Sequence, residues 1–291
     1  MNLKTDTQPR IKKVGILKLG NIASSILLEM LLDERADRED IQVRTISSGA
    51  KLTETATNEA FELLSKEVFD LVIIATPNAS LKIPKQIIKK IHEKGQPVIV
   101  ITDHLKKETK EEFVSEKIGF LVVKADAMIG ARREFLDPIE MALYNSDLLK
   151  VLAIGGAFTI LYSEINRALE SIVKKNTENY LPQVVITAKK AVKAADFFNP
   201  YAKAKARAAL EIAEKVAKVN SEACFKLQER QQYLHQVATA HEMMQTAAKL
   251  AGEAREIEKS INKVKRQPHH YKGQIQSKRL LMEKPDNPYK D

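Results

Sequence analysis

The sequence predicts an α/β fold: a Rossmann-like doubly wound parallel sheet followed by a helix-bundle domain and a small C-terminal β segment or arm. Three observations carry this prediction. The first 125 residues alternate short β-branched apolar runs with amphipathic stretches, a pattern typical of β-α-β units around a parallel sheet. From about residue 138, Ala, Lys, Glu and Leu recur at helical spacing. The segment after Lys265 carries three prolines and a short run from Gly273 to Met282.

Five apolar runs are expected to form strands, and the stretches between them are long enough for right-handed crossover helices. The runs are VGILKLG (14–20), IQVRTIS (41–47), DLVIIAT (70–76), PVIVIT (97–102) and GFLVVKA (119–125), with helices at about 22–36, 53–67, 80–94 and 106–117. In such sheets ligands bind outside the carboxyl ends of the strands. One crevice is therefore expected to be bordered by the loops at 18–25, 47–51, 76–80, 102–106 and 125–134.

The second half is expected to be helical. The expected helices are 138–150, 156–175, 183–196, 200–218 and 231–263, with breaks at Gly155-Gly156, Pro182 and Asn199-Pro200. The stretch 184–195 begins like a strand, which leaves its first turn open. The predicted domains are an α/β ligand-binding domain (1–137), a helix-bundle domain (138–265) and a basic C-terminal tail with a possible β segment (266–291).

Composition limits the classes of protein. Of 291 residues, 44% are hydrophobic and 29% are charged, which excludes both a disordered and a membrane-embedded chain. The longest uncharged apolar run, 151–163, is too short for a spanning helix, and the N-terminus has no apolar segment typical of a secretory signal. A single cysteine, Cys224, permits no internal disulfide and no thiolate zinc site. We therefore expect a cytoplasmic protein.

The net charge of +9 lies mostly in the tail. From Lys259 onward there are nine Lys or Arg against three acidic residues, a surplus of six. The rest of the chain interleaves acids and bases as on ordinary solvated helix faces. Because no recognition motif accompanies the basic tail, nucleic-acid binding is not expected to be the main function.

The first strand-to-helix turn lacks the dinucleotide fingerprint. It contains Gly20, but Lys18 and Ala23 stand where G-x-G-x-x-G needs glycines. The second strand ends in Ser47-Ser48-Gly49 and Lys51 rather than in an acidic residue, which disfavours NAD and suits a phosphate or another polar anion. Alternatively, Gly20 only permits a tight turn and Ser24 caps a helix.

The stretch KADAMIGARREFLDP (124–138) places a dense charge cluster just after the fifth strand. Its charged residues are Asp126, Arg132, Arg133, Glu134 and Asp137, around Gly130. Glycine allows close backbone approach, and adjacent arginines offer forked donors for carboxylate, phosphate or carbonyl groups. The alternative is a set of surface ion pairs before a helix with Pro138 at its first position.

Neither a nucleophile arrangement nor a metal-ligand spacing is found among the six histidines. His241 lies on a long expected helix, where a lone histidine is more often a structural hydrogen-bonding group than a catalyst. We therefore expect no metal.

Eight blocks of the chain together resemble one protein family. They are GILKLGNI (15–22), LLDERADR (31–38), SSGAK (47–51), VKADAMIGARREFLDP (123–138), YNSDLLKVLAIGGA (144–157), LPQVVI (181–186), NPYAKAKA (199–206) and AHEMMQTAAKLAGEAREIEK (240–259). In this order, from about residue 11 to 284, they resemble the archaeal coenzyme F420-dependent methylenetetrahydromethanopterin dehydrogenases.

The resemblance implies an α/β domain, a helix bundle and a small β segment, assembled as a hexamer built from dimers. It also implies reversible hydride transfer between the reduced deazaflavin, coenzyme F420, and the methenyl-tetrahydromethanopterin cation. Such a transfer needs no proton transfer in the same step, which agrees with the missing catalytic dyad. Asp126 and Glu134 are the candidates for an electrostatic catalytic role.

The resemblance and the crevice loops together give the remaining candidate residues. Coenzyme-binding residues are expected at Lys18, Gly20, Asn21, Ser48, Lys51, Pro77, Asn78 and Asp103. Substrate-binding residues are expected at Met128, Gly130, Arg132, Arg133, Asn145, Tyr201 and His241.

The chain departs from the family pattern at the coenzyme edge. Family members usually carry glycine at Ala23, proline near Ile26, and a Gly-Asp-x-Pro-Gly type of loop at 102–106. Small residues let a flat ring approach the backbone, whereas His104 and Leu105 add bulk. A non-catalytic paralogue that binds a pterin or a partner protein is therefore the alternative to a dehydrogenase.

Overall fold

A computed structural model describes the chain except for residues 1–9, 34–35, 127–134, 136, 174–178 and 286–291. Its centre is a parallel sheet with the strand order β2-β1-β3-β4-β5-β6, in which six strands are described. The strands are β1 (Lys12–Lys18), β2 (Ile41–Ser47), β3 (Leu71–Ala75), β4 (Val98–Thr102), β5 (Gly119–Val123) and β6 (Gln183–Ile186). All strands are parallel, but the order in which the chain adds them changes side between β1 and β3. This change is typical of a doubly wound sheet and confirms the predicted fold class.

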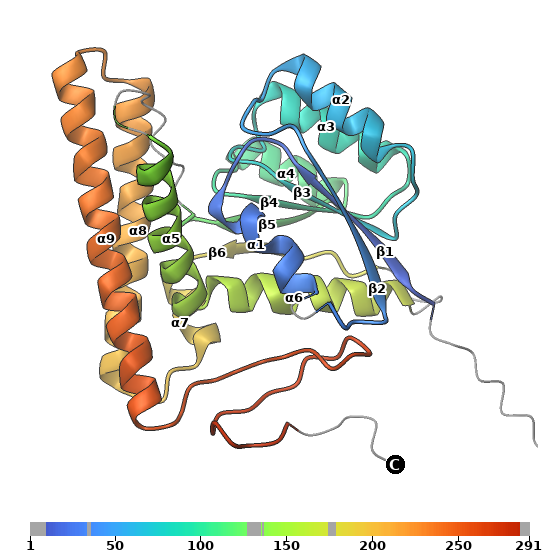
Figure 1. Cartoon of the computed structure of the whole chain (residues 1–291). Coiled ribbons are helices and arrows are strands. Elements are labelled where there is room, and N and C mark those ends of the chain that lie inside the picture. Colours follow the sequence, from blue (N-terminus) through green and yellow to red (C-terminus); the bar gives the residue numbers. More distant parts are fainter. Residues whose placement is uncertain (1–9, 34–35, 127–134, 136, 174–178, 286–291) are drawn as a thin grey trace, which may run out of the picture.

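The three central strands, β3, β4 and β5, are buried along their whole length. Their apolar side chains alternate between two cores, one on each face of the sheet. One face is covered by α2 (Glu54–Leu64), α3 (Lys82–Glu93) and α4 (Lys107–Ser115). The other is covered by α1 (Ala23–Leu32), α5 (Pro138–Gly155) and α6 (Ala157–Val173), as Figure 1 shows.

The helical layer continues into α7 (Ala188–Ala195), α8 (Pro200–Phe225) and α9 (Arg230–Ser260). The long helices α8 and α9 lie side by side with α5 (Figure 1), and buried alanines such as Ala206 and Ala247 allow close packing. Gly156 makes the turn between α5 and α6: its φ is +93°, and a Cβ there would lie 2.2 Å from the Ala191 carbonyl oxygen.

The expected helix over 183–196 is wrong in its first part. Residues 183–186 form β6, which extends the sheet beside β5, and the helix begins only at Ala188, after Thr187. The β-branched run Val184–Ile186 gains a full strand partner there, which outweighs the helical tendency of the alanines and lysines behind it. One strand of the sheet thus comes from the segment assigned to the helix bundle.

The C-terminal segment forms a small antiparallel β segment, as expected. Two bridges, Arg266 with Lys278 and His269 with Ile275, join its two arms. This hairpin contacts its own chain: the Tyr162 hydroxyl of α6 donates to the Gln267 carbonyl oxygen at 2.6 Å, and Glu39 N donates to the Tyr271 carbonyl oxygen at 2.9 Å. In Figure 1 the hairpin runs below α6 from the end of α9.

Among the described residues, no single helix is both long and apolar enough to cross a membrane. Only α5 and α6 reach that length and composition together, as a pair bent by 67°.

Candidate active site

The loops after β1 and β2 are tied together at the carboxyl edge of the sheet. Gly20 turns the chain with a φ of +75°, and a Cβ at this position would lie 3.2 Å from Leu52 and 3.3 Å from Pro77. Gly20 N donates to Ser48 Oγ at 3.3 Å, and Ser48 N donates to the Lys18 carbonyl oxygen at 3.0 Å. The turn therefore packs closely against the loops that follow β2 and β3.

The loops after β3 and β4 form a second connected rim. Buried Thr102 donates to the Pro77 carbonyl oxygen at 3.1 Å and accepts from Ala79 N at 3.2 Å. His104 N also donates to Pro77 O, at 3.3 Å. The Asn78 carbonyl oxygen Oδ1 accepts from Ser80 N at 2.9 Å. The altered loop at 102–106 is thus held in place by hydrogen bonds to the neighbouring loop.

Leu105 and His104 point in different directions at this rim. Leu105 packs against the core on the α2–α4 face, and His104 is exposed. Thr76, just after β3, is buried, and its hydroxyl has no hydrogen-bond partner among the described residues. The edge therefore carries one buried polar atom that protein groups in the described part of the chain leave unsatisfied.

Asp126 anchors the start of α1 from the far end of β5. Its carboxylate is fully buried and accepts three hydrogen bonds: from Ala23 N at 2.8 Å, from Ser24 N at 3.0 Å and from the Ser24 hydroxyl at 2.5 Å. No side chain caps α1 at Ile22, so Asp126 satisfies its free N–H groups from another element. Ser24 therefore binds this aspartate instead of capping the helix itself.

Asp103 and Asp126 form a coupled pair at the edge. Burial raises the pKa of Asp103 to about 8, and the nearby Asp126 carboxylate adds to this rise. Burial also raises the pKa of Asp126, but the three donors around it favour its charged form. Since the pKa of Asp103 is raised to about 8, Asp103 holds its proton at neutral pH.

The helical layer supplies an aromatic cluster opposite this edge. The imidazole of His241 on α9 lies 4.7 Å from the Phe135 ring and 4.5 Å from the Tyr144 ring of α5, between ring centroids. The Tyr144 hydroxyl accepts from Asn220 Nδ2 of α8 at 3.0 Å, and burial raises the pKa of Tyr144, with a smaller contribution from Asp126. Asp126, which anchors α1, thus also acts on Tyr144 of this cluster.

Two predicted residues carry buried polar atoms without a partner among the described residues: Asn145 Oδ1 and His241 Nε2. Among the predicted coenzyme-binding residues, one forms an ion pair and two are exposed to solvent. Lys18 Nζ lies 3.0 Å from Glu29 Oε1 of α1, whereas Asn21 and Lys51 are exposed at the rim.

Tyr201 lies away from the other predicted substrate-binding residues. It is 77% exposed in the first turn of α8, and Asn220, which contacts the aromatic cluster, follows 19 positions later. At 1.5 Å per residue this separation is about 28 Å along the helix. Asn199 is the N-cap of α8, because its Oδ1 accepts hydrogen bonds from Tyr201 N and Ala202 N, and Pro200 begins the helix.

Five predicted residues, Met128, Gly130, Arg132, Arg133 and Glu134, lie outside the described residues. At the end of the same block, Asp137 Oδ1 accepts from Ile139 N and Glu140 N, with Pro138 in the first turn of α5. The expected helix with Pro138 at its first position is thus confirmed, and Asp137 is its N-cap.

Sequence reasoning missed Glu140, Tyr144 and Asn220. The signal available for Asn220 was a polar residue on the otherwise apolar stripe of α8 that includes Ala213 and Val216. Glu140 and Tyr144 lie four residues apart on α5 and both contact His241, but nothing in the sequence pairs α5 with α9.

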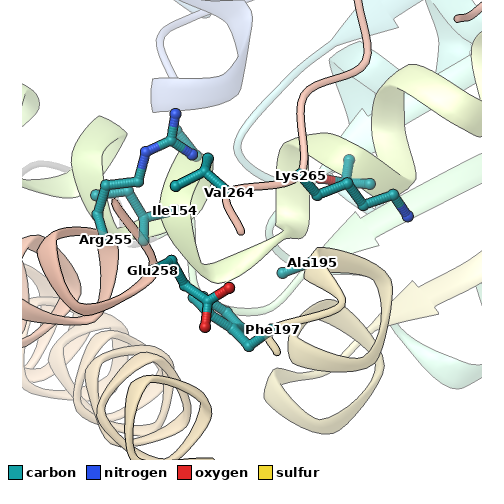
Figure 2. Close-up of a pocket in the computed structure, with 9 residues that line it drawn as sticks. Ile154, Ala195, Phe197, Arg255, Glu258, Val264 and Lys265 are labelled. Atoms are coloured by element: carbon teal, nitrogen blue, oxygen red, sulfur yellow. The ribbon is translucent and has the colours of Figure 1, made fainter. Parts of the chain in front are cut away.

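A small cavity of about 50 Å³ lies elsewhere, where α9 meets the start of the C-terminal segment. Figure 2 shows that its lining side chains Arg255 and Lys265 point away from each other. The carboxylate of Glu258 is already occupied by Phe198 N and Asn199 N. None of the predicted site residues lines this cavity. The described residues also contain no group of three or more His, Cys, Asp or Glu that could hold a metal ion.

Known proteins of one family match this chain over almost its whole length. A family model described as methylene-5,6,7,8-tetrahydromethanopterin dehydrogenase matches residues 12–286. The F420-dependent methylenetetrahydromethanopterin dehydrogenase of Archaeoglobus fulgidus is 50% identical over 276 residues, covering 95% of this chain and 100% of the relative. The enzyme of the same description from Methanocaldococcus jannaschii is 46% identical over 277 residues, with the same coverage.

A solved structure is similar in fold as well. It is an F420-dependent methylene-tetrahydromethanopterin dehydrogenase in complex with methylene-tetrahydromethanopterin and coenzyme F420. It aligns with a TM-score of 0.88 at 40% identity and covers 95% of this chain and 100% of the solved chain.

Proposed function

This chain belongs to the methylene-5,6,7,8-tetrahydromethanopterin dehydrogenase family, and we propose that it transfers a hydride reversibly between reduced coenzyme F420 and methenyl-tetrahydromethanopterin in one-carbon metabolism. The supporting observation is 50% identity to an F420-dependent dehydrogenase over 95% of the chain. When bound, the coenzyme supplies or accepts the hydride. The one-carbon unit of the pterin is the other partner, so the protein does not have to move a proton in the same step.

The carboxyl edge of the sheet fits a flat coenzyme ring. At Gly20 the positive φ and the close side chains of Leu52 and Pro77 leave no room for a side chain, so the turn stays tight at this edge. Thr76 offers a buried hydroxyl that has no partner among the described residues. We assign the coenzyme to this edge, with Gly20, Asn21, Ser48, Lys51, Pro77, Asn78 and Asp103 around it and Lys18 behind it, paired to Glu29.

Orientation is the main contribution of the protein to such a transfer. Holding two reactants in the reactive geometry can supply on the order of 7 to 11 kcal/mol. The hydrogen bonds that join the four loops keep their backbone fixed before any ligand arrives. The bound rings then meet a rim that does not have to reorganise.

Asp126 acts through its electric field, not through contact, because its carboxylate is fully buried beneath α1. A fixed negative charge near the crevice stabilises the cationic methenyl form of the pterin relative to the neutral methylene form. Asp103 is protonated at neutral pH, since its pKa is raised to about 8 by burial and by Asp126, and it therefore adds no second charge. Glu134 keeps its proposed electrostatic role.

The pterin is proposed to bind between this edge and the helices. Asn145 and His241 supply polar groups from the helical side, and Met128, Gly130, Arg132 and Arg133 are proposed to complete the site. Tyr201 is not included, because it lies near the opposite end of α8.

We further propose a homo-oligomer, a hexamer, in the cytoplasm. Exposed apolar side chains on the outer side of the helices, such as Ile139, Leu143 and Phe225, support association because water contact with them is unfavourable. Light scattering should give six times the chain mass of 32.7 kDa. A monomer at micromolar concentration would contradict this assignment. The single cysteine supports the reducing compartment.

Spectroscopy tests the activity directly. Purified protein should change the absorbance of coenzyme F420 only when the matching pterin is present, because neither ligand alone completes the transfer. The control omits the pterin. An unchanged spectrum with both intact ligands at any protein concentration would favour the non-catalytic paralogue.

A further inference from the structure

We propose that the imidazole nitrogen Nε2 of His241 accepts a hydrogen bond from an N–H group of the pterin, and that Glu140 is the positioning residue that prepares His241 for this role. The proposal rests on the proposed function and deepens it, because it names the group of the substrate that the helical side recognises. Its basis is the arrangement of three side chains from α5 and α9.

The plane of the imidazole is fixed by two neighbouring rings. Phe135 meets it edge-on, at an interplanar angle of 80°, and Tyr144 lies tilted against it at 34°. The hydroxyl of Tyr144 is itself held by Asn220 at 3.0 Å. Only 10% of the His241 side chain is exposed, so the ring has little freedom to turn away.

Glu140 determines which imidazole nitrogen carries the proton. Its Oε2 lies 3.5 Å from Nδ1 of His241, four positions before Tyr144 on the same face of α5. A carboxylate there favours a proton on Nδ1, which leaves Nε2 with a lone pair. Burial lowers the pKa of His241, although the Glu140 carboxylate opposes this shift, so the ring is neutral at neutral pH.

The acceptor nitrogen is then left without a donor. Nε2 is buried and has no hydrogen-bond partner among the described residues. Asn145 Oδ1, one residue after Tyr144, is a second buried acceptor in the same situation. An unsatisfied buried acceptor costs free energy until a donor reaches it. The unsatisfied Nε2 in this aromatic cluster indicates a ligand edge that carries an N–H donor, and the amino and amide groups of a pterin ring have this chemistry.

The charged or titratable groups around His241 are few in the described part of the chain. They are Glu140 and Tyr144 of α5 and Glu242 of α9. From α8, the uncharged Asn220 contacts the cluster through the Tyr144 hydroxyl. Protonation of His241 turns Nε2 from an acceptor into a donor, so pterin binding should weaken on the acid side. We call this loss of pterin affinity at low pH the acid limb of the binding profile. Glu140 stabilises the protonated ring, so removal of Glu140 should move the acid limb to lower pH.

Calorimetric titration of the full-length protein with methylene-tetrahydromethanopterin between pH 5 and pH 8 tests the proposal without turnover. His241→Phe keeps an aromatic ring and removes the acceptor, so pterin affinity at pH 7 should fall about tenfold and the acid limb should disappear. His241→Gln keeps an acceptor oxygen that does not titrate. It should bind within about threefold of the wild type at pH 7, also without the limb.

Glu140→Gln should shift the acid limb to lower pH, whereas a purely structural role of Glu140 would leave the limb in place. Glu242→Gln is the matched comparison, because it removes an exposed carboxylate beside His241 on the same helix without changing a contact of the ring. The Glu242 carboxylate raises the pKa of His241 less than Glu140 does, so this variant should shift the acid limb in the same direction by the smaller amount. Coenzyme F420, titrated separately, should bind all four variants equally.

Three results would overturn the proposal. If His241→Phe binds the pterin like the wild type, or if the acid limb persists in both His241 variants, Nε2 does not contact the ligand, although the dehydrogenase activity would stand. If the wild type itself binds coenzyme but no pterin at any pH, the proposed function fails and the proposal fails with it.

Discussion

Asp126 shows at the scale of a residue what sequence reasoning can and cannot reach. Its position after the fifth strand placed it at the expected ligand crevice, and the family resemblance implied an electrostatic role for it there. Its hydrogen bonds to Ala23 and Ser24 could not be predicted, because they join residues more than 100 positions apart. The same holds for His241, whose partners Glu140 and Tyr144 come from a different helix.

The raised pKa of Asp103 predicts a pH-dependent stability. Burial, and then the Asp126 carboxylate, raise it to about 8 in the folded state, above the ordinary value of 3.8. Between these values the folded protein binds the proton that the unfolded chain has lost, so the free energy of unfolding should fall as pH rises from about 4 to about 8.

Asp103→Asn should remove this dependence, because asparagine resembles the protonated acid. Urea unfolding should show equal stability of variant and wild type near pH 4 and a gain of several kcal/mol, at most about 6 kcal/mol, for the variant above pH 8. The exposed Glu111→Gln on α4 serves as the control and should follow the wild type. Parallel curves for Asp103→Asn and the wild type would contradict the assignment.

At the scale of elements, the first five strands could be predicted because buried parallel strands are continuous β-branched runs. For β6 the sequence left strand and helix open, and this has a physical reason. β6 has only four residues and passes directly into α7 through Thr187, so the alanines and lysines that follow dominate the local pattern. What makes it a strand is the free edge of β5, which only the folded sheet supplies.

The start of α4 offers a test of local stability. Its N-cap is Lys106, an exposed residue that makes no side-chain cap and places a positive charge at the positive end of the helix. Lys106→Asp should raise the free energy of unfolding by about 1 kcal/mol, measured by urea denaturation, because the new carboxylate can accept from the free N–H groups. Lys106→Ala removes the charge without adding a cap and should gain only a few tenths of that amount. Equal effects of both variants would argue against capping.

At the scale of the molecule, one apolar core runs from the sheet through α1, α5 and α6 into α8 and α9. The apolar periodicity of the helices could not predict this continuous core, because it does not show which helix packs against which other helix or against the sheet. The C-terminal hairpin adds a polar connection. Arg38 binds Asp40 through two nitrogens at 2.8 Å each, and its Nη1 lies 2.9 Å from His269 Nε2. Asn166 Oδ1 of α6 lies 3.0 Å from the same imidazole nitrogen.

This connection predicts that His269 contributes to global stability. His269→Ala should lower the free energy of unfolding by about 2 to 3 kcal/mol, because it opens a cavity beside Tyr162 and takes one contact from a buried guanidinium. Thermal and urea unfolding measure the loss. The neighbouring His270→Ala, at a less buried position, should cost less than 1 kcal/mol. A similar small loss for both variants would show that the hairpin adds little to the fold.

The separation of Arg38 and His269 in the sequence also delays their contact during synthesis of the chain. The two side chains are 231 positions apart, and at roughly 5 to 20 residues per second the ribosome needs about 12 to 46 seconds to add the second after the first. The strands β1 to β5 are complete by Val123 and can pair during this interval. The guanidinium of Arg38 must rely on Asp40 and on the Leu32 carbonyl oxygen until the hairpin emerges. The nascent chain therefore closes this face of the molecule in one of its last steps.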